Sequence, residues 1–231
     1  QVFPFREESA EVLSWALQED TSWRSPYLLA LIQSFRNNKT QAFQLLSKVT
    51  EAVNFAPFYI LRARLTEEQY KDRQLKDLEQ AVKIDNKEWR YGQLLARSFT
   101  NKKMYEQAQK VLKPYYEANP ANYIVGMDYV RTLILSHDYL EAENVLKHIT
   151  ILPFEGATAG HKYYEEVKLM LAIQALADKK YALARTKIVE ARAWPINLGV
   201  GEPYEDMKYQ KNIVLMDAEL KKKMENQENY Q

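Results

Sequence analysis

Apolar residues recur along the chain with the period of an α-helix. In the segment 105–112, Tyr105, Ala108 and Leu112 are three and four residues apart, so they share one helix face. Only 6 Gly and 8 Pro occur in 231 residues, which favours long helices over many short strands. The pattern predicts helices over 7–19, 25–36, 39–52, 56–66, 69–83, 87–101, 104–118, 121–136, 139–149, 159–178, 180–193 and 205–223.

The helical pattern also repeats at a fixed interval. The stretch Tyr105-Glu-Gln-Ala108-Gln-Lys-Val-Leu112 returns 34 residues later as Tyr139-Leu-Glu-Ala142-Glu-Asn-Val-Leu146. It returns again after a further 42 residues as Tyr181-Ala-Leu-Ala184-Arg-Thr-Lys-Ile188, which predicts an added loop between these two units. The preceding helix of each unit carries matched pairs at Leu29-Ala30, Leu61-Arg62, Leu95-Ala96, Tyr129-Val130 and Leu171-Ala172.

In the second helix of each unit, a small residue is usually followed four residues later by a large apolar one. The matched positions are Ala42, Gln74, Ala108, Ala142 and Ala184, and then Leu46, Leu78, Leu112, Leu146 and Ile188. Small residues let two helices approach closely, and the large residues fill the seam to the next pair. Because one helix pair cannot bury its own apolar face, the pattern predicts a stack of pairs.

These residues resemble the tetratricopeptide repeat (TPR) family, whose repeat of about 34 residues contains a helix A and a helix B. The resemblance implies an all-α, right-handed α-α superhelix of about five helix pairs plus a closing helix. It places a helix arriving from an upstream region in 1–22, five units in 23–196, and an irregular loop, closing helix and polar tail in 197–231. Arg62, Gln74 and Tyr115 depart from the family's small residues, which questions how tightly the second and third units pack.

A second, narrower resemblance rests on Phe3-Pro-Phe-Arg-Glu7, Ile151-Leu-Pro-Phe-Glu-Gly156 and the stretch 193–204. These segments look like the C-terminal repeat region of a bacterial multidomain family of unknown function. In that family a β-rich, sugar-enzyme-like domain precedes the repeats. The resemblance implies that this chain is the C-terminal part of a longer protein with a link to carbohydrate metabolism.

Composition changes this picture mainly by exclusion. The formal net charge of +1, without a basic stripe, argues against nucleic acid as a partner. The absence of Cys excludes thiol catalysis and disulfides, and no apolar run approaches the length of a membrane span, so we expect no membrane insertion. The compartment stays open, with periplasmic, secreted and cytoplasmic locations all compatible with the sequence.

The chain offers little catalytic chemistry. His137, His148 and His161 lack the spacing of a zinc protease motif. Glu165 and Glu166 are adjacent, so on a helix they point apart, and we expect them on a solvated surface rather than as an acid–base pair. We therefore predict no catalytic residue, no metal and no cofactor for this chain, although an upstream catalytic domain is possible.

The TPR resemblance implies that a concave face formed by the A helices holds a protein or peptide. The family's ligand-facing positions carry over to Arg24, Tyr27, Leu31, Tyr59, Ala63, Arg90, Gln93, Arg97, Met127, Arg131, Leu169 and Ile173, with the groove centred on Tyr59, Arg90, Gln93, Arg97, Met127 and Arg131. Guanidinium groups suit carboxylates, so an acidic partner is expected there. The alternative is that the arginines pair with local Glu or Asp residues.

Two irregular segments, Ile151–His161 and Trp194–Pro203, each follow helix B of a unit. Because the two units are neighbours, we expect the segments side by side, as one docking patch that carries Phe154, Glu155, His161, Trp194, Asn197, Leu198 and Tyr204. In the alternative interpretation, Trp194 and Leu198 only seal the end of the core. The sequence thus leaves open a peptide-binding scaffold, a domain that packs on an upstream carbohydrate-active domain, and a homodimer.

Overall fold

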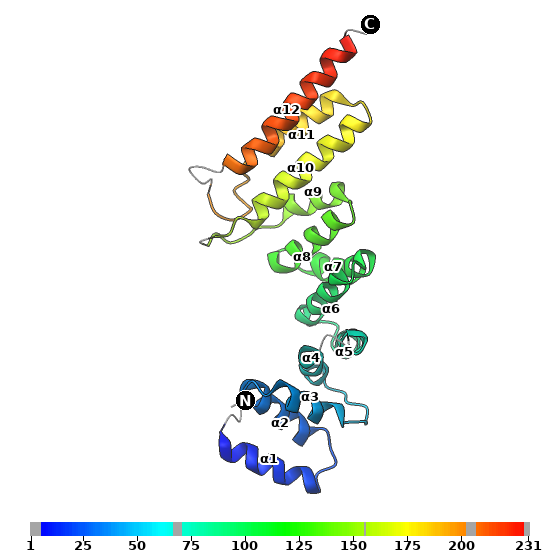
Figure 1. Cartoon of the computed structure of the whole chain (residues 1–231), viewed down its shortest axis with the longest axis vertical. Coiled ribbons are helices and arrows are strands. Elements are labelled where there is room, and N and C mark those ends of the chain that lie inside the picture. The colour runs from blue at the N-terminus through cyan, green and yellow to red at the C-terminus, as the bar shows by residue number, and fades with distance from the viewer. Residues whose placement is uncertain (1–5, 67–70, 155, 202–206, 229–231) are drawn as a thin grey trace. The chain divides into compact units, whose positions relative to one another are not determined.

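The protein is an array of helix pairs. The computed structural model describes residues 6–66, 71–154, 156–201 and 207–228. Within these ranges it contains no strand, and its helices are α1 (Glu7–Glu19), α2 (Arg24–Phe35), α3 (Lys39–Ser47), α4 (Ala56–Leu65), α5 (Lys71–Ile84), α6 (Trp89–Asn101), α7 (Tyr105–Ala118), α8 (Tyr123–Leu135), α9 (Tyr139–His148), α10 (Ala159–Ala177), α11 (Tyr181–Ala191) and α12 (Met207–Glu228) (Figure 1). The predicted all-α class is confirmed.

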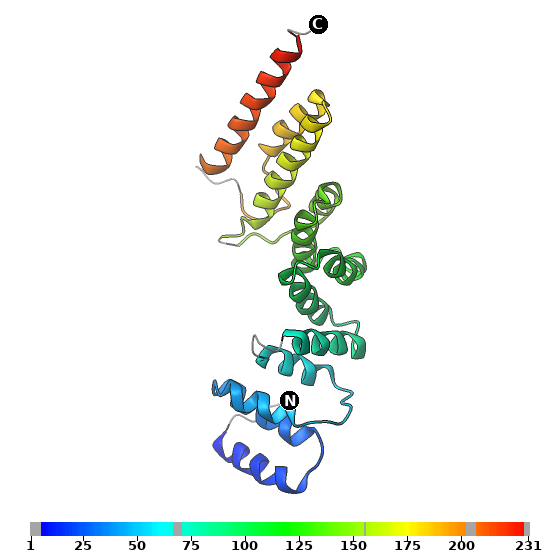
Figure 2. The ribbon, with the colours of Figure 1, turned by 45° about the vertical axis from the view of Figure 1, so that its right-hand side comes forward.

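The chain divides into two compact units, Gln1–Ser98 and Phe99–Gln231. In the first unit, consecutive helices from α1 to α5 pack on one another, and α2 also contacts α4. In the second unit, consecutive helices from α7 to α12 pack on one another, and α10 also contacts both α8 and α12 (Figure 2). Within each unit, therefore, the first helices of successive pairs form one layer.

Close helix contacts occur at the repeated small position. Ala42, Ala108, Ala142 and Ala184 have no exposed surface. The large residues four positions later, Leu46, Leu112, Leu146 and Ile188, are also buried. The Cβ methyl groups at these positions are completely covered by the neighbouring helix, so the recurrence seen in the sequence is consistent with close helix packing.

The turn inside each pair also recurs. Asn37, Lys103, His137 and Lys179 have positive φ angles of about 60°. The next backbone N–H in each case donates to a carbonyl five residues earlier, as in Asp138 to Leu133 and Lys180 to Ala175. This Schellman-type closure satisfies a carbonyl at the end of the first helix and reverses the chain into the second. The corresponding turn of the second repeat, near 67–70, lies outside the described residues.

Polar residues replace the small residues at Arg62 and Gln74 in the second repeat, and Arg62 forms a buried ion pair. The Arg62 Nε and Nη2 atoms donate to the two carboxylate oxygens of Asp77, at 2.9 and 2.6 Å. Asp77 is buried, and the Arg62 guanidinium also lies over the Phe58 ring. Gln74 Nε2 donates to the carbonyl of Ala63 at 3.1 Å. The departures from the repeat pattern at these positions are thus accommodated by polar contacts between α4 and α5.

A second group of buried charges links three helices of the second unit. Lys168 of α10 is hydrogen-bonded to Glu143 of α9 and, at 2.5 Å, to Glu190 of α11. Lys187 also contacts both carboxylates, at 2.7 and 3.2 Å. Burial alone would raise the pKa of Glu143, but the two lysines outweigh it and lower the pKa to about 2. The four charges balance, so each ion is compensated inside the helix stack.

Two helix ends differ from the sequence-based expectation. The helix predicted over 39–52 ends at Ser47, because the chain then extends to bury Val53. In this extended stretch the Glu51 carboxylate accepts the backbone N–H of Trp23 at 2.6 Å. The closing helix runs to Glu228, whereas the prediction ended it at 223. The long polar stretch at its end is therefore helical rather than an unstructured tail.

We predict that Ala142→Leu lowers the free energy of unfolding by about 1–3 kcal/mol, because the added methyl groups overpack a fully buried contact. Chemical denaturation provides the measurement. Ala182→Leu, at an exposed position of α11, is the matched control and should change stability by less than about 0.5 kcal/mol. Equal stability of the two variants would mean that the helix pairs are misaligned.

Asp77→Ala should lower the free energy of unfolding by about 3 kcal/mol, because it leaves the Arg62 guanidinium buried without its carboxylate. Glu79→Ala, an exposed carboxylate on the same helix, is the control. The double variant Arg62→Leu with Asp77→Leu removes both charges and should be more stable than Asp77→Ala. If Asp77→Ala melts like wild type, the ion pair does not hold α4 to α5.

Candidate functional site

The two irregular segments of the second unit lie against each other, as predicted. We call residues 151–154, 156–161 and 194–201 together the loop clasp. Ile151 and Leu198 form a parallel β-bridge, and the Ile151 N–H donates to the Asn197 carbonyl at 2.7 Å. A second backbone hydrogen bond joins Val200 to Ala157 at 3.4 Å. The added loop that lengthens the repeat to 42 residues is thus paired with the segment that follows α11.

The Asn197 side chain fastens the clasp to the end of α9. Its Nδ2 atom donates to the carbonyl of Leu146 at 3.1 Å and to that of Ile149 at 2.8 Å. The last carbonyls of a helix have no partner within the helix itself. An amide from a distant loop therefore completes the hydrogen bonding of α9.

An aromatic stack closes the other side of the clasp. The rings of His161 and Trp194 are parallel, with centroids 3.7 Å apart. His161 Nε2 and Trp194 Nε1 both donate to the Val200 carbonyl, at 3.1 and 2.8 Å. Because a carbonyl only accepts, Nε2 carries the proton of neutral His161 and Nδ1 is the bare nitrogen. Nδ1 is buried and has no hydrogen-bond partner in the described part of the chain, and burial lowers the pKa of His161.

Glycine is required where the two halves of the clasp approach most closely. Gly199 has a φ angle of 120°, and a Cβ atom there would lie 2.2 Å from the Ala157 carbonyl oxygen. A Cβ at Gly160 would lie 2.7 Å from the Leu198 carbonyl oxygen. Both clashes involve backbone, which cannot move aside as a flexible side chain does.

The predicted docking residues divide into two groups. His161, Trp194, Asn197 and Leu198 hold the clasp together, and Leu198 is almost fully buried, as the core-sealing interpretation expected. Phe154, in contrast, is largely exposed, together with Leu152 and Ile196, the last of which is 95% exposed. Glu155 and Tyr204 lie outside the described residues. The clasp therefore keeps an apolar outer surface that its own packing does not use.

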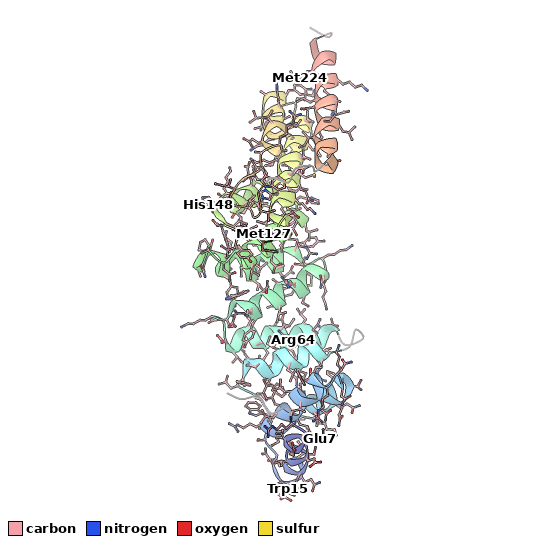
Figure 3. The ribbon with its side chains drawn as sticks, turned by 90° about the vertical axis from the view of Figure 1, so that its left-hand side faces the viewer. Glu7, Trp15, Arg64, Met127, His148 and Met224 are labelled. Atoms are coloured by element: carbon pink, nitrogen blue, oxygen red, sulfur yellow. The ribbon has the colours of Figure 1, made fainter. Side chains whose placement is uncertain are left out.

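The predicted concave positions fall in both units, so a single groove through all of them stays a prediction. Tyr59, Arg90, Gln93 and Arg97 belong to the first unit, and Met127 and Arg131 to the second. Tyr59 and Gln93 are buried, and Arg97 is exposed. Arg90 pairs with Glu88 at 3.1 Å and lies over the Trp89 ring, so local pairing holds for this arginine. Met127, labelled in Figure 3, is half-buried on α8, and Arg131 is exposed.

A groove of about 660 Å³ lies between α10 and α12. We call it the α10–α12 groove. Successive turns of each helix contribute its walls, which consist of Lys162, Tyr163, Glu165, Glu166, Leu169, Met170, Ile173, Asn212, Leu215 and Met216. Leu169 and Met216 join the core beneath, whereas Ile173 and Leu215 remain 45% and 59% exposed. The groove is therefore mainly apolar and open to solvent.

Carboxylates sit at one end of this groove. Glu165 is buried, so the expectation of a solvated surface was wrong for it, because α12 and neighbouring helices pack against α10. Burial raises the pKa of Glu166. Burial also raises the pKa of the neighbouring Tyr163, and the positive charge of Arg131 partly offsets this effect. Arg131 thus lies close enough to the groove to influence its polar end.

The α12 wall of the groove was missed from the sequence. Leu169 and Ile173 were predicted as ligand-facing positions, but Asn212, Leu215 and Met216 were not. The repeat pattern stops before α12, so no matched position pointed to them. The apolar spacing of Ile213, Met216 and Leu220 marks the inward face of α12 and could have located the groove beside it.

The described residues contain no group of three or more Asp, Glu, His or Cys side chains suited to a metal ion. No helix among them has the length and apolar character that crossing a membrane requires.

Acidification should lower the stability of the loop clasp. Because burial lowers the folded-state pKa of His161 below 6.5, the unfolded chain takes up this proton first. The stability contributed by neutral His161 is therefore present above pH 6.5 and is lost as pH falls through that value toward the folded pKa. The lowered pKa of Glu143 acts separately, below about pH 4.5.

The measurement is the free energy of unfolding at a series of pH values from about 7.5 to about 5, a range that brackets the ordinary pKa of histidine. His161→Phe keeps an aromatic ring against Trp194 but cannot titrate, so its profile should be flatter than that of wild type. His148→Gln, at an exposed position, should keep the wild-type slope. A wild-type slope in His161→Phe would contradict the assignment.

The fold is similar to that of several proteins of known structure. No protein-family model matches the sequence, and no curated protein is significantly similar to it. Among solved structures, YrrB, a TPR protein with an unusual peptide-binding site, aligns with a TM-score of 0.56 at 13% identity, covering 79% of this chain and 91% of that chain. The C-terminal part of a TPR repeat-containing protein from Cytophaga hutchinsonii gives 0.56 at 14% identity, over 80% and 72%. A chain of the Naa15/Naa10 complex bound to HypK-THB gives 0.52 at 14% identity, over 91% of this chain and 36% of that chain. At these identities the similarity establishes the fold alone, and this chain has the helix-pair fold of TPR proteins.

Proposed function

We propose that this chain is a protein-interaction module that holds a partner peptide in the α10–α12 groove. The observation that carries this proposal is an open groove of about 660 Å³ with exposed apolar walls. Exposing Ile173 and Leu215 to water is unfavourable, and burying them against a partner would release that free energy. The groove is concave and apolar with polar groups at its edge, which is the usual character of a binding site.

The position of the groove in the fold supports the same function. It lies in the layer of first helices, where the TPR resemblance places ligand-facing side chains, and Leu169 and Ile173 occupy two of those positions. The fold is shared with YrrB, which is described as having a peptide-binding site. These arguments favour a binding scaffold over an enzyme.

The predicted arginine positions remain a finer proposal for an acidic partner. Arg97 on α6 and Arg131 on α8 are exposed cations, and each of these helices is the first helix of a repeat. Arg90 is less suited to this role, because Glu88 already accepts its guanidinium.

A second candidate function is docking of another domain on the loop clasp. The exposed side chains of Leu152, Phe154 and Ile196 favour it, because they offer apolar surface on a rigidly bonded scaffold. The resemblance to the bacterial multidomain family suggests an upstream carbohydrate-active domain as the occupant, and a homodimer is the alternative. Light scattering of wild type and Ile196→Asp would separate them, since a dimer held by the clasp would dissociate in the variant.

The peptide-binding proposal is tested by selecting peptides from a random displayed library on the wild-type protein. Ile173→Asp places a charge in the groove and should weaken the selected peptides at least about tenfold. Leu183→Asp is a matched control, because Leu183 of α11 has the same 45% exposure as Ile173 but lies outside the groove.

The control should leave binding unchanged. If no peptide is enriched, or if the enriched peptides bind Ile173→Asp as tightly as wild type, the groove is not the binding site. Far-ultraviolet circular dichroism of both variants would confirm that they remain folded.

A further inference from the structure

The charged residues of the α10–α12 groove are not equivalent. Lys162, Glu165 and Glu166 all line it. Lys162 and Glu165 each already take part in an interaction within the chain. Glu166 forms no hydrogen bond or ion pair with any described residue. Its negative charge contributes to the raised pKa of the neighbouring Tyr139 and Tyr163. Glu166 is exposed, and among the described residues it is the groove carboxylate with which no cation pairs.

The surroundings of Glu166 make this carboxylate a receptor for positive charge. Its side chain is exposed at the end of the groove, and partial burial there raises its pKa. A carboxylate that is partly removed from water is destabilised in its charged form unless an opposite charge or hydrogen-bond donors replace the lost hydration. An ammonium or guanidinium group from a partner would supply both the charge and the donors.

The apolar part of the groove begins one helical turn away. Leu169 and Ile173 follow Glu166 by three and seven residues on α10, so the wall runs about 10 Å beyond the carboxylate at 1.5 Å per residue. Leu215 and Met216 form the opposite wall on α12. Two helices that flank an apolar channel are suited to the apolar face of a third helix, and the flexible side chains of Met170 and Met216 can adapt to its shape.

From this arrangement we propose that the groove binds a basic amphipathic helix of a partner protein. Its Lys or Arg side chain meets Glu166, and its apolar face lies on Ile173 and Leu215. This inference rests on the proposed function and adds the chemistry of the partner. It differs from the acidic partner expected for the arginine positions, because those side chains are not among the residues lining this groove.

Two synthetic helix-forming peptides test the inference on the full chain. One carries leucines along one face and lysines at its other positions, and the second has glutamates in place of the lysines. Fluorescence anisotropy of the labelled peptides should show at least about tenfold tighter binding of the lysine peptide. Its affinity should fall with added salt, because the Glu166 contact is electrostatic.

Variants separate the site from general attraction. Glu166→Gln should weaken the lysine peptide about three- to tenfold and reduce its salt dependence. Glu106→Gln removes one exposed carboxylate from α7, outside the groove, and should have no effect. Equal thermal melting of both variants would show that the fold is unchanged.

The outcomes distinguish this inference from the proposed function. Equal binding of the two peptides, or no effect of Glu166→Gln, would overturn the basic partner, while the groove would stand as a peptide site if Ile173→Asp abolished binding. If neither peptide binds wild type, the inference fails and the library selection alone decides the proposed function. If Ile173→Asp leaves peptide binding intact, both the inference and the proposed function fail.

Discussion

The close contact between the two helices of each pair is the constraint on which the array depends. Only small side chains fit there, and Ala108, Ala142 and Ala184 are accordingly buried without exposed surface. Close approach brings the large residues of the next turn into the seam between neighbouring pairs. The second repeat meets the same constraint differently, because Arg62 and Gln74 replace the small residues and bond to Asp77 and to the Ala63 carbonyl across the contact. A repeat can therefore lose its small residue provided that the inserted polar groups find partners.

Additional contacts reinforce the second unit beyond this repeat geometry. The buried charges of Lys168, Glu143 and Glu190 join α9, α10 and α11, and the loop clasp joins the same region from outside. Asn197 reaches the end of α9 across about fifty residues of sequence, so it links segments that the repeat alone would not connect. This support fixes α10, which forms one wall of the groove, and a preorganised wall would lower the entropy lost on binding the proposed partner.

Features that depend on local spacing could be predicted from the sequence. The helix pairs and buried small positions follow from residues three and four apart, and the side-by-side loops follow from the order of the units. Features that depend on a specific tertiary contact could not. The end of α3 is set by burial of Val53, and the burial of Glu165 depends on the helices that pack on α10. The α12 side of the groove has no matched repeat position, so periodicity could not locate Leu215.

The groove has two physical explanations, and Glu166 bears on the choice between them. Apolar surface beside α12 could simply reflect the end of a repeat array, where a helix packs on α10 and α11 on one side and lacks a partner on the other in the described chain. Helices that serve only as caps present a polar, well-hydrated outer face. Here Ile173 and Leu215 are exposed instead, and the exposed Glu166 carboxylate beside them pairs with no cation among the described residues. The exposed apolar side chains are unfavourable in the free protein. The amphipathic cationic partner that we propose would cover them and pair with Glu166, which favours a binding surface over a cap.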